Sequence, residues 1–246
     1  MAQPHIRGGF AMKTREKLVF LLDCDNTLLD NDRLQDDLQA HLDHAFGAAN
    51  RERYWQIFEA LRAELGYADY LGALQRYRLD SLNDPRLLLM SAFLVDYPFA
   101  DRLYPRALEV IEHLGAWGPT VVLSDGDVVF QPRKIQRSGL WKAVEGRVLI
   151  YIHKETMLDD VEQRYPARHY VMVDDKPRIL AAMKAVWKDR LTTVFPRQGH
   201  YAHDPHAVTA YPAADLTVEH IGDLLNYDLA VLLDAARANH TEQRSP

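Results

Sequence analysis

Carboxylate side chains recur in this 246-residue sequence directly after short runs of apolar residues. Carboxylates gathered in one place repel one another, and a hard divalent cation relieves that repulsion. Among such cations, Mg²⁺ typically binds one or two carboxylates and completes its shell with water and phosphate oxygens. The sequence therefore predicts a Mg²⁺ site with these candidate ligands: Asp23, Asp25, Asp174 and Asp175.

Two further polar residues stand in equivalent places but suit a different partner. Ser124 follows the apolar run Thr120–Leu123, and Lys154 follows the run Val148–Ile152. A hydroxyl and an ammonium group can both hold phosphate oxygens and offset their charge. Taken singly, Ser124 is better explained as a turn residue and Lys154 as a solvated lysine. The pair Asp174-Asp175 taken alone is better explained as part of a loop or a helix cap. Their recurrence after successive apolar runs is what predicts a site for phosphoryl transfer.

The apolar runs themselves predict the strands that position these residues. Each run is short and uninterrupted, as a strand buried on both faces requires; the others are Leu18–Leu22, His169–Val173 and Leu191–Phe195. Helical patterns such as Pro105–Leu114 and Pro177–Trp187 separate them. This alternation predicts an α/β protein with a doubly wound, Rossmann-like parallel sheet. Right-handed crossovers would bring the carboxyl ends of the strands to one edge, where ligands bind.

Residues 32–102 interrupt the alternation and carry only helical periodicity. Apolar side chains recur there at the three- and four-residue spacing of a helix face. They form three stripes: Leu34, Leu38, Leu42 and Phe46; Trp55, Phe58, Leu61 and Leu65; Tyr70, Leu74 and Tyr77. The prediction is an all-helical cap inserted into a core formed by 17–31 and 103–236, with flexible ends at 1–16 and 237–246.

Composition excludes several other classes of protein. Lys and Arg number 29 against 35 Asp and Glu, and the net charge of −6 disfavours a broad nucleic-acid surface. The single cysteine, Cys24, excludes an internal disulfide and a cysteine-based zinc site, and we interpret it as a small buried apolar residue. No apolar run approaches the roughly 20 residues that span a membrane. We expect a cytoplasmic protein whose partner is a small phosphorylated metabolite, with no nucleic-acid or membrane partner; its oligomeric state stays open.

In the order of its motifs the sequence resembles the haloacid dehalogenase-like (HAD) hydrolase superfamily over about residues 17–226. The segment Asp23-Cys24-Asp25-Asn26-Thr27 is similar to the first motif of that family. Ser124 is similar to the second, Lys154 to the third and Asp174-Asp175 to the fourth. The helical insertion lies where the family carries its type-1 cap. Response-regulator receiver domains use a similar set of residues, but they place the acidic pair first, whereas here it comes last.

The resemblance implies a Mg²⁺-dependent phosphatase that hydrolyses a small phosphomonoester through an aspartyl-phosphate on Asp23. Asp25 would act as general acid and base, and its main-chain carbonyl would be a further Mg²⁺ ligand. Ser124 and Lys154 would hold the phosphate oxygens. The alternatives are a phosphomutase or another HAD-type hydrolase on the same scaffold, and a binding domain without catalytic activity.

Two assignments within the resemblance need a choice. The fourth motif reads Asp-Asp-Lys-Pro where Gly-Asp-x-x-x-Asp is common, and we expect Asp175 to bind the metal directly and Asp174 through water. Lys134 competes with Lys154 for the phosphate-binding role. Lys154 is preferred because Lys134 falls within the helix that follows the second motif.

The sequence does not decide which residues contact the substrate. Candidates in and beside the cap, each also explained by solvation or core packing, are Asn31, Arg33, Tyr54, Tyr70 and Arg76. The segment Arg197–His206 carries three histidines, His200, His203 and His206, and could be a surface loop, a substrate-facing loop or a zinc site. Lys176 and Arg178 follow the acidic pair and could either pair with it or contact the substrate.

Overall fold

The computed structural model describes residues 18–80 and 84–234, so the predicted flexible ends, 1–16 and 237–246, lie outside the described residues. Its centre is a parallel sheet of six strands in the order β3-β2-β1-β4-β5-β6. The strands are β1 (Leu18–Leu22), β2 (Thr120–Asp125), β3 (Val148–Tyr151), β4 (His169–Val173), β5 (Leu191–Pro196) and β6 (Leu216–Val218). The direction of winding reverses between β1 and β4, as in a doubly wound fold. The predicted Rossmann-like α/β fold is confirmed.

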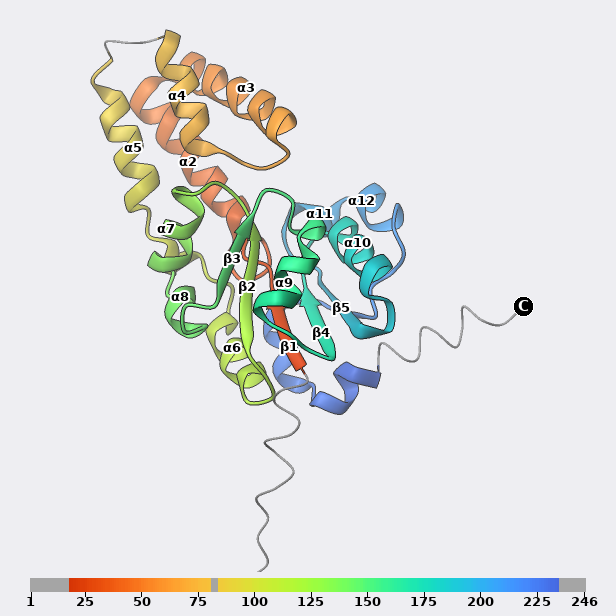
Figure 1. The fold of residues 1–246 in the computed structure, drawn as a ribbon. Coiled ribbons are helices and arrows are strands. Elements are labelled where there is room, and N and C mark those ends of the chain that lie inside the picture. The colour runs from red at the N-terminus through yellow and green to blue at the C-terminus, as the bar shows by residue number, and fades with distance from the viewer. Residues whose placement is uncertain (1–17, 81–83, 235–246) are drawn as a thin grey trace, which may run out of the picture.

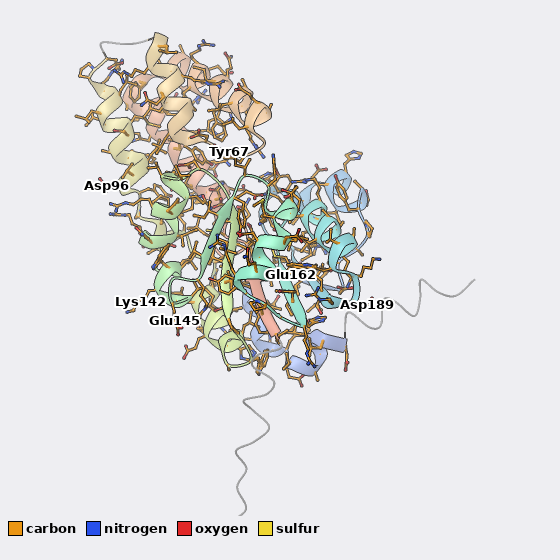
Figure 2. The ribbon with its side chains drawn as sticks, in the orientation of Figure 1. Tyr67, Asp96, Lys142, Glu145, Glu162 and Asp189 are labelled. Carbon is orange, nitrogen blue, oxygen red and sulfur yellow. The ribbon has the colours of Figure 1, made fainter. Side chains whose placement is uncertain are left out.

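Helices cover both faces of this sheet (Figure 1). One face packs against α6 (Ala107–Gly115), α7 (Phe130–Arg137), α8 (Leu140–Ala143) and the 3₁₀ helix η4 (Ile221–Asn226). The other packs against α9 (Leu158–Arg164), α10 (Pro177–Trp187), α11 (Gly199–His203) and α12 (Pro205–Thr209). Two short 3₁₀ helices, η2 (Lys154–Thr156) and η3 (Lys188–Arg190), complete the described core. Charged side chains such as Asp96 and Lys142 lie on the outside (Figure 2).

Strand β1 explains why the first apolar run is uninterrupted. The side chains of Leu18, Phe20 and Leu22 join the apolar cluster on the α6 face, and those of Val19 and Leu21 join the cluster on the α10 face. Every one of them is 5% exposed or less. Because both faces of the strand are buried, no position along it tolerates a polar residue until the strand ends.

Between β1 and α6 every element of the described chain is a helix. The elements are α2 (Asn31–Phe46), α3 (Ala48–Leu65), α4 (Tyr70–Asp80), α5 (Arg86–Asp96) and the 3₁₀ helix η1 (Phe99–Arg102). The first predicted stripe, from Leu34 to Phe46, is buried where α2 packs against α3 and α5. Figure 1 shows these helices as a separate lobe at one end of the sheet, with α5 next to α7. We call this lobe the cap.

The predicted limits of several elements differ from those observed. Strand β2 continues through Ser124 and Asp125, which were expected to follow it, and β3 ends before Ile152. Strand β6 was not predicted, because three residues are too short for a periodic pattern. The helix expected at Pro105–Leu114 spans Ala107–Gly115, whereas Pro177–Trp187 matches α10. No helix in the described ranges is both long enough and apolar enough to span a membrane.

Candidate active site

The carboxyl ends of β1 and β4 lie side by side at the point where the winding of the sheet reverses. Leu22 is paired with Val173, and the N–H of Asp23 donates to the carbonyl oxygen of Val173 at 2.9 Å. The residues after the two strands therefore meet. Oxygens of Asp23, Asp174 and Asp175 all lie within 4.8 Å of one another, and all three side chains are buried.

Lys154 reaches this acidic group from the start of η2, just after β3. Its ammonium donates to Asp23 Oδ1 and, at 3.2 Å, to the carbonyl oxygen of Leu123, and it lies 2.7 Å from Asp174 Oδ2. Burial by itself lowers the pKa of this ammonium, but the carboxylates of Asp174 and Asp23 together raise it above the ordinary value. Burial raises the pKa of Asp23 to about 6, although Lys154 opposes that shift. Lys154 thus contacts two of the three buried carboxylates, those of Asp23 and Asp174.

Several carboxylate oxygens in this group have no partner. Both side-chain oxygens of Asp175, and Oδ2 of Asp23, are buried without a hydrogen bond to any described residue. The main chain of Asp175 is held in place, since its N–H donates to Thr27 Oγ1 at 3.0 Å. Burial raises the pKa of Asp175 well above its ordinary value. A hard divalent cation fits this donor set, because it would bind the unpaired oxygens and offset the negative charge.

The chain turns sharply after Asp23. The N–H of Leu28 donates to the carbonyl oxygen of the buried Cys24 at 3.0 Å, which closes the turn. Asn26 has a φ of +59°, a left-handed conformation that asparagine adopts more readily than most residues. Its side-chain oxygen accepts the N–H of Asn31 at 3.0 Å, so the same residue also fixes the start of α2. Asn26 therefore links the turn after β1 to the first helix of the cap.

This turn places the carboxylate of Asp25 apart from the three clustered ones. Lys134 Nζ lies 2.5 Å from Asp25 Oδ1, and Gln131 Nε2 donates to Asp25 Oδ2 at 3.1 Å. The same Gln131 amide donates to Ser124 Oγ at 2.9 Å. The acidic group therefore does not include the Asp25 side chain, although Asp25 was among the predicted metal ligands. Lys134 and Gln131 hold the Asp25 carboxylate instead.

Helix α7 supplies both partners of Asp25. Gln131 and Lys134 are three residues apart and so lie on one face of the helix. Lys134 is 1% exposed and also donates to Asn31 Oδ1 at 3.0 Å. Sequence reasoning weighed Lys134 only as a substitute for Lys154, and it missed Gln131. In the structure the two lysines are not interchangeable, because Lys154 contacts Asp23 and Lys134 contacts Asp25.

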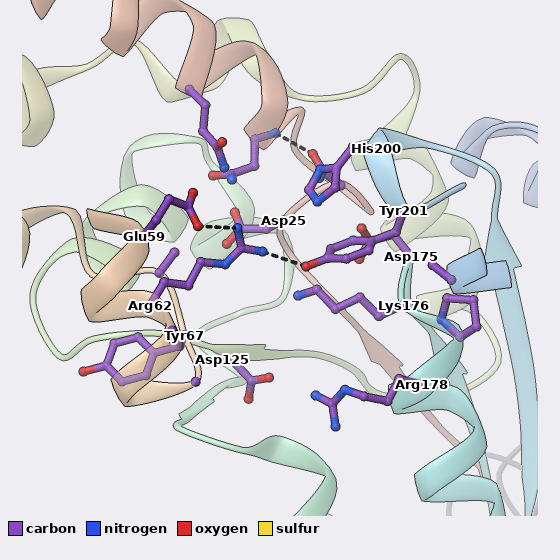
Figure 3. Close-up of a pocket in the computed structure, with 18 of the residues that line it drawn as sticks. Asp25, Glu59, Arg62, Tyr67, Asp125, Asp175, Lys176, Arg178, His200 and Tyr201 are labelled. Atoms are coloured by element: carbon purple, nitrogen blue, oxygen red, sulfur yellow. Dashed lines mark hydrogen bonds and ion pairs between the residues drawn. The ribbon is translucent and has the colours of Figure 1, made fainter. Parts of the chain in front are cut away.

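A cavity of about 650 Å³ lies between the cap and the carboxyl ends of the strands. Its floor includes Asp25, Asp125 and Asp175 (Figure 3). The cap contributes Glu59 and Arg62 of α3, together with Tyr67. Helix α11 contributes His200 and Tyr201, and the turn after β4 contributes Lys176 and Arg178. This volume is in the range of small-molecule sites.

Of the predicted substrate contacts in the cap, Asn31 and Tyr70 line this cavity. Tyr54 does not, because it is buried within the cap and its hydroxyl donates to the carbonyl oxygen of Tyr70 at 2.9 Å. Arg76 is paired with Glu64 on the surface, at 2.9 Å. Arg33 is exposed and lies 3.6 Å from Asp37. The sequence pattern missed Arg62, because an arginine on an amphipathic helix is indistinguishable from a solvated one.

The segment with three histidines forms the short helices α11 and α12. His200 Nδ1 lies 2.7 Å from Asp32 Oδ1, and the N–H of His200 donates to Asp32 Oδ2 at 2.7 Å. His203 and His206 do not line the cavity. Within the described part of the chain the only group of side chains spaced to hold a metal ion is the acidic one, so the zinc alternative is not supported. The segment faces the cavity through His200 and Tyr201.

Lys176 and Arg178 take different partners. Arg178 Nη1 lies 2.5 Å from Glu155 Oε1, so the idea that it pairs with the preceding acidic residues was wrong. Lys176 Nζ lies 5.7 Å from the centre of the Tyr201 ring. No carboxylate of the described residues lies within 4.0 Å of that ammonium. Burial lowers the pKa of this ammonium, but the carboxylates of Asp175, Asp23 and Asp174 together raise it, so Lys176 lies in the field of the acidic group without a close ion pair.

Comparison with known proteins agrees with this geometry. The family model for haloacid dehalogenase-like hydrolases matches residues 18–186. A haloacid dehalogenase-like hydrolase from Burkholderia xenovorans LB400 is 70% identical, with 88% of this chain and 99% of that chain covered and a TM-score of 0.84. No curated protein matches the chain.

Two more distant structures share the fold. The HAD-hydrolase YfnB from Bacillus subtilis, bound to magnesium, is 14% identical over 85% of this chain and 97% of that chain, with a TM-score of 0.59. The L-2-haloacid dehalogenase PA0810 is 17% identical over 85% of this chain and 98% of that chain, with a TM-score of 0.59. At identities this low, the similarity to these two structures shows a shared fold only.

Proposed function

This chain belongs to the haloacid dehalogenase-like hydrolases, and we propose that within this family it is a Mg²⁺-dependent phosphatase of a small phosphomonoester. The observation that supports this proposal is the acidic group at the switch point of the sheet. Three buried carboxylates lie together with unpaired oxygens, and the Lys154 ammonium contacts two of them, which suits a divalent cation and a phosphate together. YfnB, which is similar in fold, is bound to magnesium.

In this proposal Asp23 is the nucleophile. A carboxylate oxygen of Asp23 forms a bond to phosphorus while the bond from phosphorus to the leaving oxygen breaks, giving an aspartyl-phosphate. Water then attacks the same phosphorus, which releases inorganic phosphate and restores Asp23. Lys154 and Ser124 hold the phosphate oxygens and offset the charge that develops on them. Lys154 already holds Oδ1 of Asp23, which leaves Oδ2 without a partner in the described chain.

Asp25 is the general acid and base. Its carboxylate lines the cavity, where it would give a proton to the leaving oxygen and later take one from the attacking water. Lys134 and Gln131 fix its orientation. A leaving alkoxide needs that proton, whereas a leaving halide does not, so an acid at this place favours phosphate over halide chemistry.

Asp23, Asp175 and the main-chain carbonyl of Asp25 would hold the Mg²⁺, and Asp174 would bind it through water. The bound cation would supply positive charge that draws the phosphate in and stabilises its transition state. Asp174 is already engaged, since its Oδ1 accepts the N–H of Lys176 at 2.8 Å and its Oδ2 faces Lys154. Both oxygens of Asp175 are unengaged by any described group, which supports Asp175 as the direct ligand.

The test is turnover of p-nitrophenyl phosphate by the purified protein with Mg²⁺, with EDTA, and in the Asp23→Asn variant. We expect phosphate release that needs both Mg²⁺ and the Asp23 carboxylate. Release of halide from 2-chloropropionate without any phosphatase activity would instead make the chain a dehalogenase. Transfer of phosphate within a sugar phosphate, without release, would make it a phosphomutase.

A further inference from the structure

Two side chains, one from the cap and one from the core, meet across the cavity. Arg62 extends from α3 of the cap, and its Nη2 donates to the hydroxyl of Tyr201, on α11 of the core, at 2.7 Å. Figure 3 shows the two pointing toward one another, with the ammonium of Lys176 directed to the same region. The cap and the core therefore build this part of the cavity together.

Arg62 has no firmly bound carboxylate. Arg62 Nη1 lies 3.7 Å from Glu59 Oε2, which is beyond hydrogen-bond distance, and the side chains of Arg62 and Glu59 are 34% and 48% exposed. Ion pairs as exposed as this contribute little, because water screens both charges. Lys176 likewise has no carboxylate of the described residues within 4.0 Å. Glu59 is thus a weak competitor for Arg62.

The other cations that line the cavity are already used. Lys134 is bound to Asp25 at 2.5 Å, and Arg178 is bound to Glu155 at 2.5 Å. A guanidinium has five N–H donors in a fixed plane, and Arg62 uses one of them on Tyr201. The remaining donors suit a planar carboxylate or the oxygens of a phosphate.

Tyr201 gives the guanidinium a fixed position. Its hydroxyl accepts from Arg62, and its ring lies under Lys176 at 5.7 Å, so the ring holds the two cations on one side of the cavity. An arginine that is already oriented loses less side-chain entropy when it binds a ligand. Lys176 follows the acidic pair directly, and the carboxylates of Asp175, Asp23 and Asp174 raise its pKa against the effect of burial, so we assign it to the acidic group. Arg62 comes from the cap and is left for another part of the ligand.

We propose that Arg62, oriented by Tyr201, binds a second anionic group on the leaving group of the phosphomonoester. The substrate class is then a phosphomonoester that also carries a carboxylate or a second phosphate. This inference rests on the proposed phosphatase function, because it assigns the far end of that enzyme's substrate.

The experiment compares substrates that differ in one anionic group. The first pair is 3-phosphoglycerate and glycerol 3-phosphate, which differ in a carboxylate, and the second is fructose 1,6-bisphosphate and fructose 6-phosphate, which differ in a phosphate. We expect kcat/KM to favour the more anionic member of at least one pair by tenfold or more. Arg62→Gln should reduce that preference by at least tenfold, chiefly through KM, and the pair that responds identifies carboxylate or phosphate.

Matched variants separate recognition from general damage. Arg51→Gln removes a charge from the same helix at a residue that does not line the cavity, and it should leave the preference unchanged. Arg62→Lys should keep part of the preference for the more anionic substrate. Tyr201→Phe should reduce that preference less than Arg62→Gln does, and Glu59→Gln should keep or increase it. A wild-type preference near one for both pairs, or one that survives Arg62→Gln, would overturn the proposal.

Failure of the phosphatase function itself would give a different result, namely no Mg²⁺-dependent turnover of any phosphomonoester, including p-nitrophenyl phosphate. In that case calorimetric binding of the same four compounds to Asp23→Asn and to Asp23→Asn/Arg62→Gln decides the role of Arg62. The proposal is supported if Asp23→Asn binds the more anionic member of a pair about tenfold more tightly than the other member and the double variant loses this difference. Equal binding of both members of each pair contradicts it.

Discussion

The ammonium of Lys134 lies 2.5 Å from the carboxylate of Asp25, and this contact joins helix α7 to the turn that follows β1. Burial by itself lowers the pKa of Lys134, but Asp25, together with Cys24 and Tyr70, raises it above the ordinary value. The same ammonium holds Asn31 at the first residue of α2. One buried lysine thus connects the proposed general acid to the base of the cap.

We expect Lys134→Met to lower kcat by about 10- to 100-fold, because Asp25 loses the group that orients it, whereas complete loss of a general acid costs about 10²- to 10⁴-fold. The free energy of unfolding should fall by about 1–3 kcal/mol, because Asp25 loses a charged partner but can still be hydrated. Steady-state kinetics and urea unfolding measure both. Lys142→Met, at an exposed position of α8, is the control and should change neither (Figure 2).

Mg²⁺ should raise the stability of the folded chain. A ligand at 100 times its Kd that binds only the folded state adds about 2.7 kcal/mol to the free energy of unfolding. A thermal melt with increasing Mg²⁺ should therefore show a rising Tm, and Asp175→Asn should abolish the rise. A rise of equal size in the variant would exclude Asp175 as a ligand.

Without metal the effect of Asp175→Asn on stability should reverse, so that the variant is the more stable protein. Asp175→Asn removes a buried charge with two unpaired oxygens, so in EDTA the variant should be more stable than wild type by about 1–3 kcal/mol. Burial raises the pKa of Asp175 in the folded state, so the protonated carboxyl favours folding at low pH. This contribution to stability is lost as the pH rises from the unfolded-state pKa of about 4 through the higher folded-state pKa. The advantage of the variant should therefore grow from pH 4 to pH 7. A variant less stable than wild type in EDTA at pH 7 would contradict this account.

Lys154→Met should destabilise the metal-free protein by about 3–5 kcal/mol, since it leaves the buried carboxylates without their cation. Denaturant unfolding in EDTA measures the loss, and added Mg²⁺ should recover part of it. The double variant Lys154→Met/Asp174→Asn, which also removes one of the charges, should be more stable than the single one. If the single variant matched wild type, the three carboxylates would not depend on Lys154.

Gly199→Ala should disturb the turn that carries Asp25. Gly199 has a φ of +68°, and a Cβ there would lie 2.6 Å from Cβ and Cγ of Asn26. We expect a loss of about 1–3 kcal/mol in unfolding free energy together with a lower kcat, because the left-handed backbone alone costs an alanine about 1–2 kcal/mol. Gly139→Ala is the matched control, since φ is +89° and nothing lies within 4 Å of its Cβ. Gly139→Ala should lose stability without losing kcat, and equal kcat losses in the two variants would argue against a specific role for Gly199.

The sequence by itself determined the layout of this protein. Runs such as Leu18–Leu22 must be apolar throughout because both faces of the strand are buried, so they can be read without knowing what packs on them. Parallel connections then bring the strand ends to one edge, which is why the meeting of Asp23 with Asp174 was predictable. The periodicity of the cap also identified its buried stripes, as Leu34 and Leu38 show.

Only the tertiary structure decided which polar side chain meets which. Helical periodicity tells which face of α7 or α3 is buried but not what lies opposite, so it could not assign Lys134 to Asp25 or Lys154 to Asp23. Arg62 and Tyr201 are 139 residues apart, and their contact depends on how the cap packs against the core. Contacts of that kind arise from the summed geometry of many packed elements, and no local pattern in the sequence records them.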